Sequence, residues 1–502
     1  MSIILISLIL GALVALYFYL TQNFKYWQKR GIPCPNGAWP VVGHMLPVVC
    51  MRTTASEHIA KIYKDYKNQS LVGFYNFSSP SLIVIEPELV KTVLQTNFAS
   101  FNKNSFQADP DLDPLVAHNP FSLTGDKWLA ARKRLTYAFS SMRLKILLEN
   151  VKPVCVLFEN YLDSKISKTG KVELELKDLF SRFTAQVVAN AGFGVDGYCF
   201  DDEKENVSFR KIGAAILEPN LRTKIVFTII FVAPVLKKLL KLRFIPKHID
   251  HFFRTLVAEL IEQRRTDKIP RNDFLHLMVE LEKLEGDKFD LEIIASHALS
   301  FVVDGYETSS TVMSFVVYQL ATHSEVQEKL REEIVSVLNK YNDEITYEGL
   351  KEMTYMDQIL SETQRLTPAA GFLTKICTEE FELKGSDGLV CRVQPGTQVQ
   401  ICLDGLHNDP QYWSNPEIFD PERFTPENKQ SINRFAFLPF GEGPRICPGM
   451  RMAVLQIKAG LAAFLRKYSL ELSPKTKVPL EMIPGSILPS PIGGLWATIR
   501  KL

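Results

Sequence analysis

Hydrophobic residues follow two patterns along the chain. An uncharged apolar run extends from Ile3 to Leu20, and between about residues 50 and 360 apolar positions recur at spacings of three and four, as in 135–162 and 293–330. Such spacing predicts helices with an apolar face. Short β-favouring runs bounded by turn residues occur near 81–85 and over 381–401, and they predict a few strands. We therefore expect a mainly α fold with a small β portion.

The first apolar run is long enough to cross a membrane. At the rise of an α-helix it extends roughly 27 Å, close to the thickness of the hydrocarbon core of a bilayer. A cleaved signal peptide is the alternative, but no basic residue precedes the run, and it ends in 17–20 with large residues. Lys25, Lys29 and Arg30 follow, and basic flanks favour the cytosolic side. Residues 1–20 are thus expected to anchor the chain in a membrane, with everything after them in the cytosol.

A proline-rich stretch follows the anchor. Pro33, Pro35 and Pro40 prevent a helix from continuing through it, because proline fixes φ and lacks an N–H donor. Residues 21–45 are therefore interpreted as a basic, stiff hinge. Neither a repeat nor a break in composition divides the remaining residues 46–502, which we expect to form one catalytic domain.

A second apolar stretch has two interpretations. The run from Ile225 to Leu236 is interrupted by Pro234 and followed by basic residues at 237–243. Apolar residues next to positive charge suit contact with a membrane surface. A stretch this short also suits a buried pair of helices, and the sequence does not decide between the two.

Charge and cysteine content exclude several kinds of function. The net charge is only +2, without the concentrated basic stripe that nucleic-acid binding needs, so no nucleic-acid partner is expected. The eight cysteines are scattered and form no C-x-x-C pair, which argues against a zinc ribbon or a thioredoxin-type site. In the reducing cytosol, disulfides are not expected either.

The strongest chemical signal lies in the glycine-rich segment Phe440–Gly449, which leads into a helical pattern over 450–465. Its glycines allow the backbone to approach a flat ligand closely. Cys447 precedes Pro448, a good first residue of a helix, so the N–H groups of a helix N-terminus would point at its sulfur and favour the thiolate. A thiolate is a proximal ligand that the iron of a haem accepts.

This segment resembles the cysteine loop of the cytochrome P-450 family, F-x-x-G-x-R-x-C-x-G. The resemblance implies that Cys447 is the proximal ligand of the haem iron and that neighbouring loop residues contact the haem. Those neighbours are Phe440, Arg445 and Gly449.

Two further segments match the same family and imply a structural brace. Glu362 and Arg365 form its E-x-x-R motif, in which an i, i+3 spacing places both charges on one helical face. Arg423, within 421–424, matches the arginine of the P-E-R-F motif. The resemblance implies that the three form a buried network that positions the cysteine loop and does no bond chemistry.

Residues that would bind the haem propionates lie elsewhere. Trp128 and Arg132 resemble the W-x-x-x-R motif, whose indole N–H and guanidinium donate to a propionate. Where the family has a further arginine, this chain has Lys375, which keeps the charge but lacks the planar fork.

The fourth match, 304–309, lies inside the apolar helical pattern 299–320. It resembles the family's A-G-x-[DE]-T-T/S. Thr308 is expected to bond back to the carbonyl of Asp304 and open a groove beside Gly305, and Glu307 and Thr308 are candidates for relaying protons.

Asp304 departs from the usual alanine of this motif. In one branch of the family a glutamate at this position is esterified to the haem, so an ester here and a simple hydrogen-bonded carboxylate both remain open.

The resemblance covers nearly the whole chain and is nearest to insect members of the microsomal, xenobiotic-metabolising branch. It implies a triangular, mostly helical prism, haem b, O2 as co-substrate, and NADPH-derived electrons. NADPH-cytochrome P-450 reductase, and in some cases cytochrome b5, would supply them. The expected function is insertion of one oxygen atom into a lipophilic small molecule. A reductase-independent enzyme that rearranges peroxides, or a haem sensor, is the alternative.

Overall fold

The computed structural model describes residues 2–502 except 167–169, 218–219, 233–239, 267–270 and 286–289. Helices make up most of the body. They are α1 (Ser2–Thr21), α2 (Leu46–Val49), α3 (Ala55–Asp65), α4 (Pro87–Lys91), α5 (Pro114–Ala117), α6 (Gly125–Ala138), α7 (Ser141–Ile166), α8 (Leu176–Val187), α9 (Phe209–Leu217), α10 (Leu221–Val232), α12 (Lys247–Thr266), α13 (Phe274–Glu285), α14 (Leu291–Thr322), α15 (Ser324–Lys340), α16 (Tyr347–Glu352), α17 (Thr354–Leu366), α18 (Leu403–His407), α19 (Pro426–Lys429) and α20 (Met450–Leu465).

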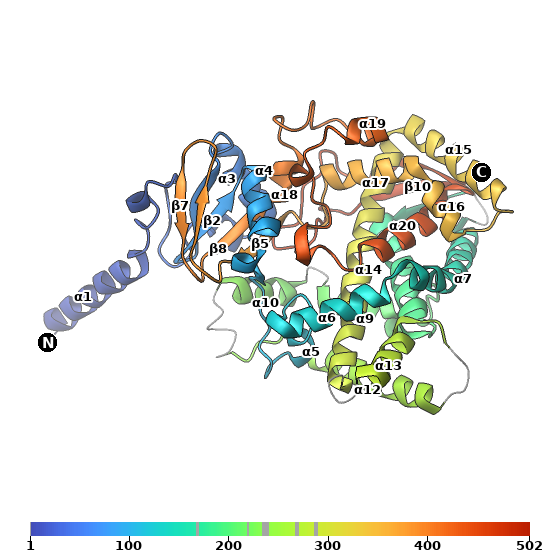
Figure 1. Ribbon diagram of the computed structural model, residues 1–502, viewed down its shortest axis with the longest axis horizontal. Coiled ribbons are helices and arrows are strands. Elements are labelled where there is room, and N and C mark those ends of the chain that lie inside the picture. Colours follow the sequence, from blue (N-terminus) through green and yellow to red (C-terminus); the bar gives the residue numbers. More distant parts are fainter. Residues whose placement is uncertain (1, 167–169, 218–219, 233–239, 267–270, 286–289) are drawn as a thin grey trace.

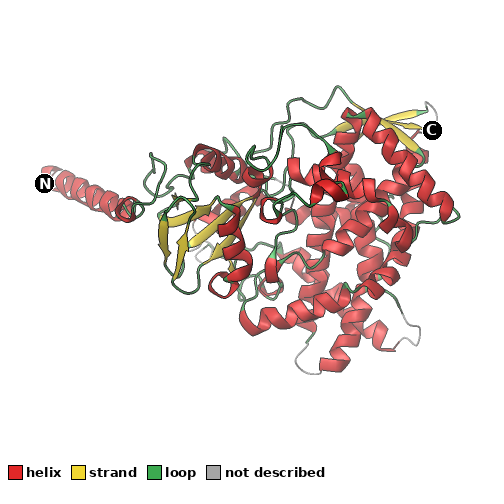
Figure 2. Ribbon diagram, turned by 45° about the horizontal axis from the view of Figure 1, so that its top comes forward, coloured by secondary structure: helices red, strands yellow, loops and turns green. Residues whose placement is uncertain are grey.

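The strands form three small sheets, which lie at two places in the molecule (Figure 2). They are β1 (Leu71–Asn76), β2 (Ser79–Val84), β3 (Lys103–Asn104), β4 (Lys171–Glu175), β5 (Phe372–Ile376), β6 (Phe381–Lys384), β7 (Val390–Val393), β8 (Gln398–Cys402), β9 (Tyr468–Leu472) and β10 (Trp496–Lys501). The largest sheet has the order β1-β2-β8-β5-β3, the second β4-β10-β9, and the third pairs β6 with β7. The predicted class, mainly α with a small β portion, is confirmed.

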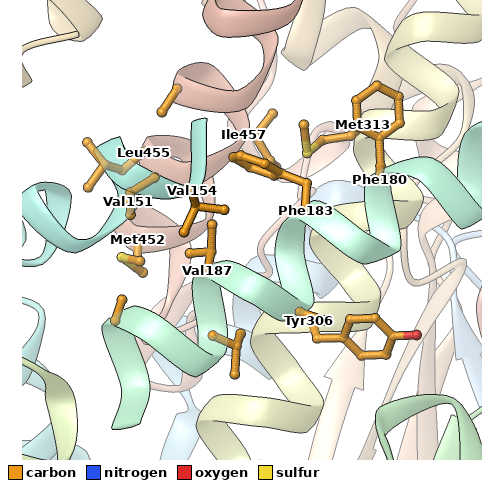
Figure 3. Close-up of a cluster of buried hydrophobic side chains, with 14 of the residues drawn as sticks. Val151, Val154, Phe180, Phe183, Val187, Tyr306, Met313, Met452, Leu455 and Ile457 are labelled. Carbon is orange, nitrogen blue, oxygen red and sulfur yellow. The ribbon is translucent and has the colours of Figure 1, made fainter. Parts of the chain in front are cut away.

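The central helix, α14, passes through the core. Its N-terminus is capped by Asp290, whose carboxylate accepts a hydrogen bond from the N–H of Ile293 at 2.9 Å. Most of its side chains are buried, which is the property of a helix surrounded by other elements. Figure 3 shows side chains packing from four helices, with Val151 and Val154 from α7, Phe180, Phe183 and Val187 from α8, Tyr306 and Met313 from α14, and Met452, Leu455 and Ile457 from α20.

Each of the two stretches with helical spacing is divided between two helices. The pattern 135–162 is divided between α6 and α7, which are separated by Phe139 and Ser140. The pattern 293–330 is divided at His323, whose φ and ψ of −131° and 78° are not helical. Apolar periodicity continues across both breaks because the helices on each side bury residues in the same core.

The N-terminal helix α1 extends away from the body (Figure 1). Its residues Ile4–Thr21 have a mean hydropathy of 2.4, and none of this stretch is buried, so its length and composition suit a membrane span. The chain then packs onto the largest sheet. Trp27 has no exposed surface and donates from Nε1 to the carbonyl of Phe74 on β1 at 3.0 Å. Contact with the sheet therefore begins well before residue 46, and the proposed division into anchor, hinge and domain stays a prediction.

The second apolar stretch lies only partly within the described residues. Its first part belongs to α10, where Ile225 is 47% exposed and Val226 is buried. The rest falls in 233–239, outside the described residues. Both interpretations, membrane contact and core, therefore stay open.

Candidate functional site

The cysteine loop folds back on itself before α20 begins. The carbonyl of Phe440 accepts a hydrogen bond from the N–H of Cys447 at 2.9 Å, and a short turn spans Gly443–Arg445. Gly443 has a φ of +76°, and a Cβ there would lie 2.0 Å from the carbonyl oxygen of Leu94. Glycine at this position is therefore required both by the backbone conformation and by the close approach of a neighbouring segment.

The sulfur of Cys447 lies at the N-terminus of α20, as the sequence predicts. Gly449 caps this helix, and the backbone N–H groups of Gly449 and Met450 hydrogen-bond to the sulfur and lower the pKa of the thiol. Burial has the larger effect, however, and together with the negative charge of Asp304 it raises the pKa above its ordinary value. The helix alone does not produce a thiolate here, but coordination to a metal ion would, since a coordinating thiol loses its proton.

Three cations, Lys375 buried and Arg132 and Arg445 half-buried, lie near the loop, and none of them has an acidic partner among the described residues. Arg132 on α6 donates to the carbonyl of Ile446 at 2.6 Å. Arg445 donates to backbone carbonyls and lies 4.5 Å from the centre of the Trp128 ring. Lys375 on β5 donates to the side-chain oxygen of Asn104 on β3 at 2.7 Å.

The electrostatics of these cations indicate an anion site. Burial, followed by the charge of Arg132, lowers the pKa of Arg445 to about 10. Burial and the charge of Arg445 lower the pKa of Lys375 to about 7. Several positive charges removed from water are unfavourable unless negative groups neutralise them. The carboxylates of the haem propionates would neutralise these three cations. The thiol and the cations thus fit the haem that the resemblance implies.

The polar turn of α14 provides the other side of the site. The hydroxyl of Thr308 donates to the carbonyl of Asp304 at 2.5 Å, which is the predicted back-bond. A Cβ added to Gly305 would meet only a methyl group of Val188, at 3.5 Å. The carbonyl of Gly305 instead accepts a hydrogen bond from Gln456 of α20 at 2.9 Å. This turn is therefore tied to α20 while its glycine stays uncrowded.

Glu307 points in a different direction from Thr308. Its Oε1 lies 3.1 Å from Nζ of Lys177 on α8, and its side chain is 8% exposed. The other oxygen, Oε2, is buried without a hydrogen-bond partner. The sequence predicts that Glu307 and Thr308 act together as a proton relay. In the structure Lys177 of α8 binds one carboxylate oxygen of Glu307, and the other oxygen makes no hydrogen bond within the described part of the chain.

Asp304 has an exposed side chain in the middle of a helix whose neighbouring residues Val302 and Tyr306 are buried. Burial of its surroundings raises the pKa of the carboxyl to about 7, and a hydrogen bond from the side chain of Asn119 partly offsets this. The carboxyl therefore faces an internal space and not bulk solvent.

The brace is formed as predicted. Arg365 donates to both oxygens of Glu362, at 2.7 and 2.8 Å, and Arg423 donates to Oε1 at 3.3 Å. Glu362 and Arg365 have no exposed side-chain surface.

A histidine connects the brace to the cysteine loop. Arg365 donates to the carbonyl of His407, and Nε2 of His407 accepts from the N–H of Leu438 at 2.8 Å. Leu438 in turn accepts from the N–H of Gly441. Burial lowers the pKa of His407 to about 3, so the ring is neutral and able to accept. The sequence analysis did not identify His407, Lys177 or Asn119, because each is a single polar residue whose partner is distant in sequence.

The family model described as Cytochrome P450 matches residues 32–495. Cytochrome P450 6a2 of Drosophila melanogaster is 33% identical, over 99% of this chain and 100% of that protein. Probable cytochrome P450 6a23 of the same organism is 35% identical, over 99% of each. Cytochrome P450 6j1 of Blattella germanica is 32% identical, over 97% of this chain and 96% of that protein.

Proposed function

Since the chain belongs to the cytochrome P450 family, we propose that it is a microsomal enzyme that oxidises lipophilic small molecules with electrons delivered from NADPH by a reductase. Membership in the family makes the chain a haem-thiolate monooxygenase, an oxidoreductase that binds haem b and uses O2. The fold is the helical fold of that family, as the sequence resemblance implied.

The observation that carries the assignment of residues is the sulfur of Cys447 at the N-terminus of α20, opposite the polar turn of α14. Cys447 would hold the iron. Arg132, Arg445 and Lys375 would pair with the propionates, which explains why these three cations lack acidic partners among the described residues. The indole N–H of Trp128 would donate a hydrogen bond to a propionate. When bound, the haem supplies the redox-active iron at which O2 is reduced.

The polar residues of α14 have separate tasks in this proposal. Thr308 holds a hydroxyl at the opened turn, where it donates and accepts protons next to the uncrowded Gly305. Glu307 supplies protons from the interior, with Lys177 keeping its carboxylate in place. The brace of Glu362, Arg365 and Arg423 keeps the cysteine loop in position through His407.

The N-terminal helix supports the proposed position at a membrane. An apolar span at Ile4–Thr21 would fix the chain in the endoplasmic reticulum membrane, with the body on the cytosolic side beside its lipids. NADPH-cytochrome P-450 reductase, and in some reactions cytochrome b5, would reach the body from the same side.

A lipophilic substrate is supported by the aromatic residues that the 104–123 segment brings together. Phe106 lies 6.2 Å from Phe121 and 5.5 Å from Phe244, ring centre to ring centre. Aromatic residues gathered in this way would suit an apolar guest. We propose substrates of the xenobiotic type.

Two other activities would use the same haem site. An enzyme that rearranges peroxides needs no electrons from NADPH, and a haem sensor needs no turnover. The acidic residue and threonine of the relay, Glu307 and Thr308, favour the monooxygenase over both, because neither alternative requires protons to be delivered to O2.

Reconstitution of the full-length protein with reductase in lipid vesicles tests the proposal. With a panel of lipophilic substrates, we expect NADPH and O2 consumption to rise with a substrate and an oxygenated product to form, and we expect neither without reductase. The absence of NADPH-dependent product with every substrate of the panel would contradict the proposal, as would product that forms at the same rate with and without reductase.

A further inference from the structure

The carboxyl of Asp304 lies inside the proposed haem site without a positive partner among the described residues. No salt bridge involves it, and the side chain that touches it is the neutral amide of Asn119. Its other electrostatic neighbour, Cys447, becomes negative in the proposed function. An ionised Asp304 is therefore uncompensated in the protein alone.

Glu307, in the next turn of the same helix, is a buried carboxylate whose charge is compensated within the protein. It is paired with Lys177 at 3.1 Å and is 8% exposed. Asp304 is exposed to the internal space of the site and has no cationic partner among the described residues. Charged groups removed from bulk water are normally paired, so an unpaired one that faces a ligand site indicates that the ligand supplies the partner.

Asn119 holds the Asp304 carboxyl at the boundary of the site. Its amide nitrogen donates to the hydroxyl of Ser300 on α14 at 2.6 Å, and its oxygen accepts from the N–H of Phe121 at 2.7 Å. The amide is thus fixed both to α14 and to the backbone of Phe121. It orients the carboxyl without neutralising it.

The proposed haem does not supply the missing charge. In a ferric haem bound by a thiolate, the charges of iron, porphyrin and sulfur cancel, and only the negative propionates remain. These propionates are matched to Arg132, Arg445 and Lys375 and not to α14. In the ligand-free protein the carboxyl is relieved by keeping its proton, and in the ionised form its positive partner would be a bound ligand.

We propose that Asp304 is a specificity-determining residue that selects, among lipophilic substrates, those that carry a positively charged nitrogen. This inference rests on the proposed function, since it names the substrate class of the same site. The carboxylate pairs with the cation, and the amide of Asn119, which is fixed by Ser300 and by the backbone of Phe121, holds the carboxyl in place.

A matched pair of ligands tests the proposal on the holoenzyme. One ligand is a phenylalkyl trimethylammonium ion, and the other is its neutral tert-butyl analogue, which has the same shape. The quaternary nitrogen has no lone pair, so it does not bind iron. Calorimetric titration at pH 8 gives both affinities, and we expect Asp304→Asn to reduce the ratio of cation to neutral affinity by roughly tenfold or more.

Two further variants make the result specific. Asp304→Glu retains the charge, and we expect it to keep most of the preference for the cation. Asp111→Asn removes an exposed carboxylate from the same 104–123 segment, and we expect it to leave the ratio unchanged.

An equal ratio in the wild type and in Asp304→Asn would overturn the proposal, as would a loss of equal size in Asp111→Asn. Haem that stays attached to the chain after acid denaturation would also overturn it, because an esterified Asp304 has no charge. These failures are distinguishable from failure of the proposed function. A holoenzyme that keeps its thiolate spectrum and oxidises neutral substrates in the reductase assay would leave the monooxygenase intact and refute only the selectivity.

Discussion

Glu362 and Asp304 are both carboxylates inside the protein, yet their surroundings differ in every respect. Glu362 has no exposed surface and accepts hydrogen bonds from Arg365, Arg423 and the backbone N–H of Asp420. Asp304 is exposed to an internal space and is touched by one neutral amide. Groups of the protein supply all the hydrogen bonds and the opposite charge that Glu362 needs. For Asp304 they supply one hydrogen bond and no opposite charge.

This difference separates structural from functional polar groups. A saturated buried network fixes the positions of the segments that it joins, here α17 and the loops that lead to the cysteine loop. A charged group without a counter-ion in the protein favours binding of a ligand of opposite charge. The cations near Cys447 belong to the second kind, because Lys375 and Arg445 also lack acidic partners among the described residues.

Removing the charge of Glu362 is expected to have the largest effect on stability. Glu362→Gln leaves Arg365 buried without its counter-ion, and breaking a buried pair in this way costs about 3–5 kcal/mol. Denaturant unfolding of the holoprotein measures the loss. The control is Glu422→Gln, which breaks an exposed pair with Lys329 and should cost about 0–1 kcal/mol. Equal losses would contradict the structural role of the brace.

Thr308→Ala should leave the fold intact and reduce the yield of product. Without the hydroxyl at the opened turn, protons reach O2 less efficiently, and we expect product per NADPH consumed to fall by roughly tenfold. The control is Thr311→Ala, since Thr311 makes the same back-bond to Glu307 at 2.9 Å but is buried among other side chains. A yield that is unchanged in Thr308→Ala would remove this residue from the proposed relay.

Lys375→Met tests whether the cations near Cys447 bind the propionates. Loss of one charge-assisted contact should speed the release of haem to an acceptor protein by about tenfold. Lys375→Arg should release haem no faster than the wild type, because the positive charge is retained. If Lys375→Met also released haem at the wild-type rate, the lysine would be only a partner of Asn104.

Asp304→Asn should give the smallest effect, a gain in stability that depends on pH. Burial raises the pKa of this carboxyl in the folded protein to about 7, above its value in the unfolded chain. The folded state therefore binds the proton more tightly, and the contribution of Asp304 to stability falls as pH rises from about 4 to about 7.

The variant Asp304→Asn has no ionisable group at this position, so its stability does not fall between about pH 4 and about pH 7 for this reason. We expect its melting temperature to exceed that of the wild type by roughly 2 °C at pH 8, since solvent within the site screens the charge, and by less at pH 5. Thermal melts of the ligand-free holoenzyme at both pH values measure the difference. A larger gain at pH 5 than at pH 8 would contradict the assigned pKa shift.

The sequence predicts those parts of the molecule that depend on local pattern. The helix over 450–465, the back-bond of Thr308 and the pairing of Glu362 with Arg365 all involve residues within one or two turns of each other, and the structure contains each of them. The direction of the effect of a helix N-terminus on the Cys447 thiol was also correct, although burial outweighs it.

Contacts between distant segments could not be predicted in this way. Lys177 reaches Glu307 from α8, and Asn119 reaches Asp304 from the segment before α6. Strands β1, β5 and β9 were missed because their pairing depends on partners far along the chain. Short strands have weak local signals, and tertiary contacts decide whether they form.

The most direct test of the central claim is the absorption spectrum of the reduced, carbon-monoxide-treated holoprotein, recorded for the wild type and for Cys447→Ser. We expect the wild type to show the red-shifted Soret band of a haem held by a thiolate, and we expect the serine variant to lack it. A wild type without that band, or a Cys447→Ser protein that retains it, would contradict the assignment of Cys447 as the ligand of the haem iron.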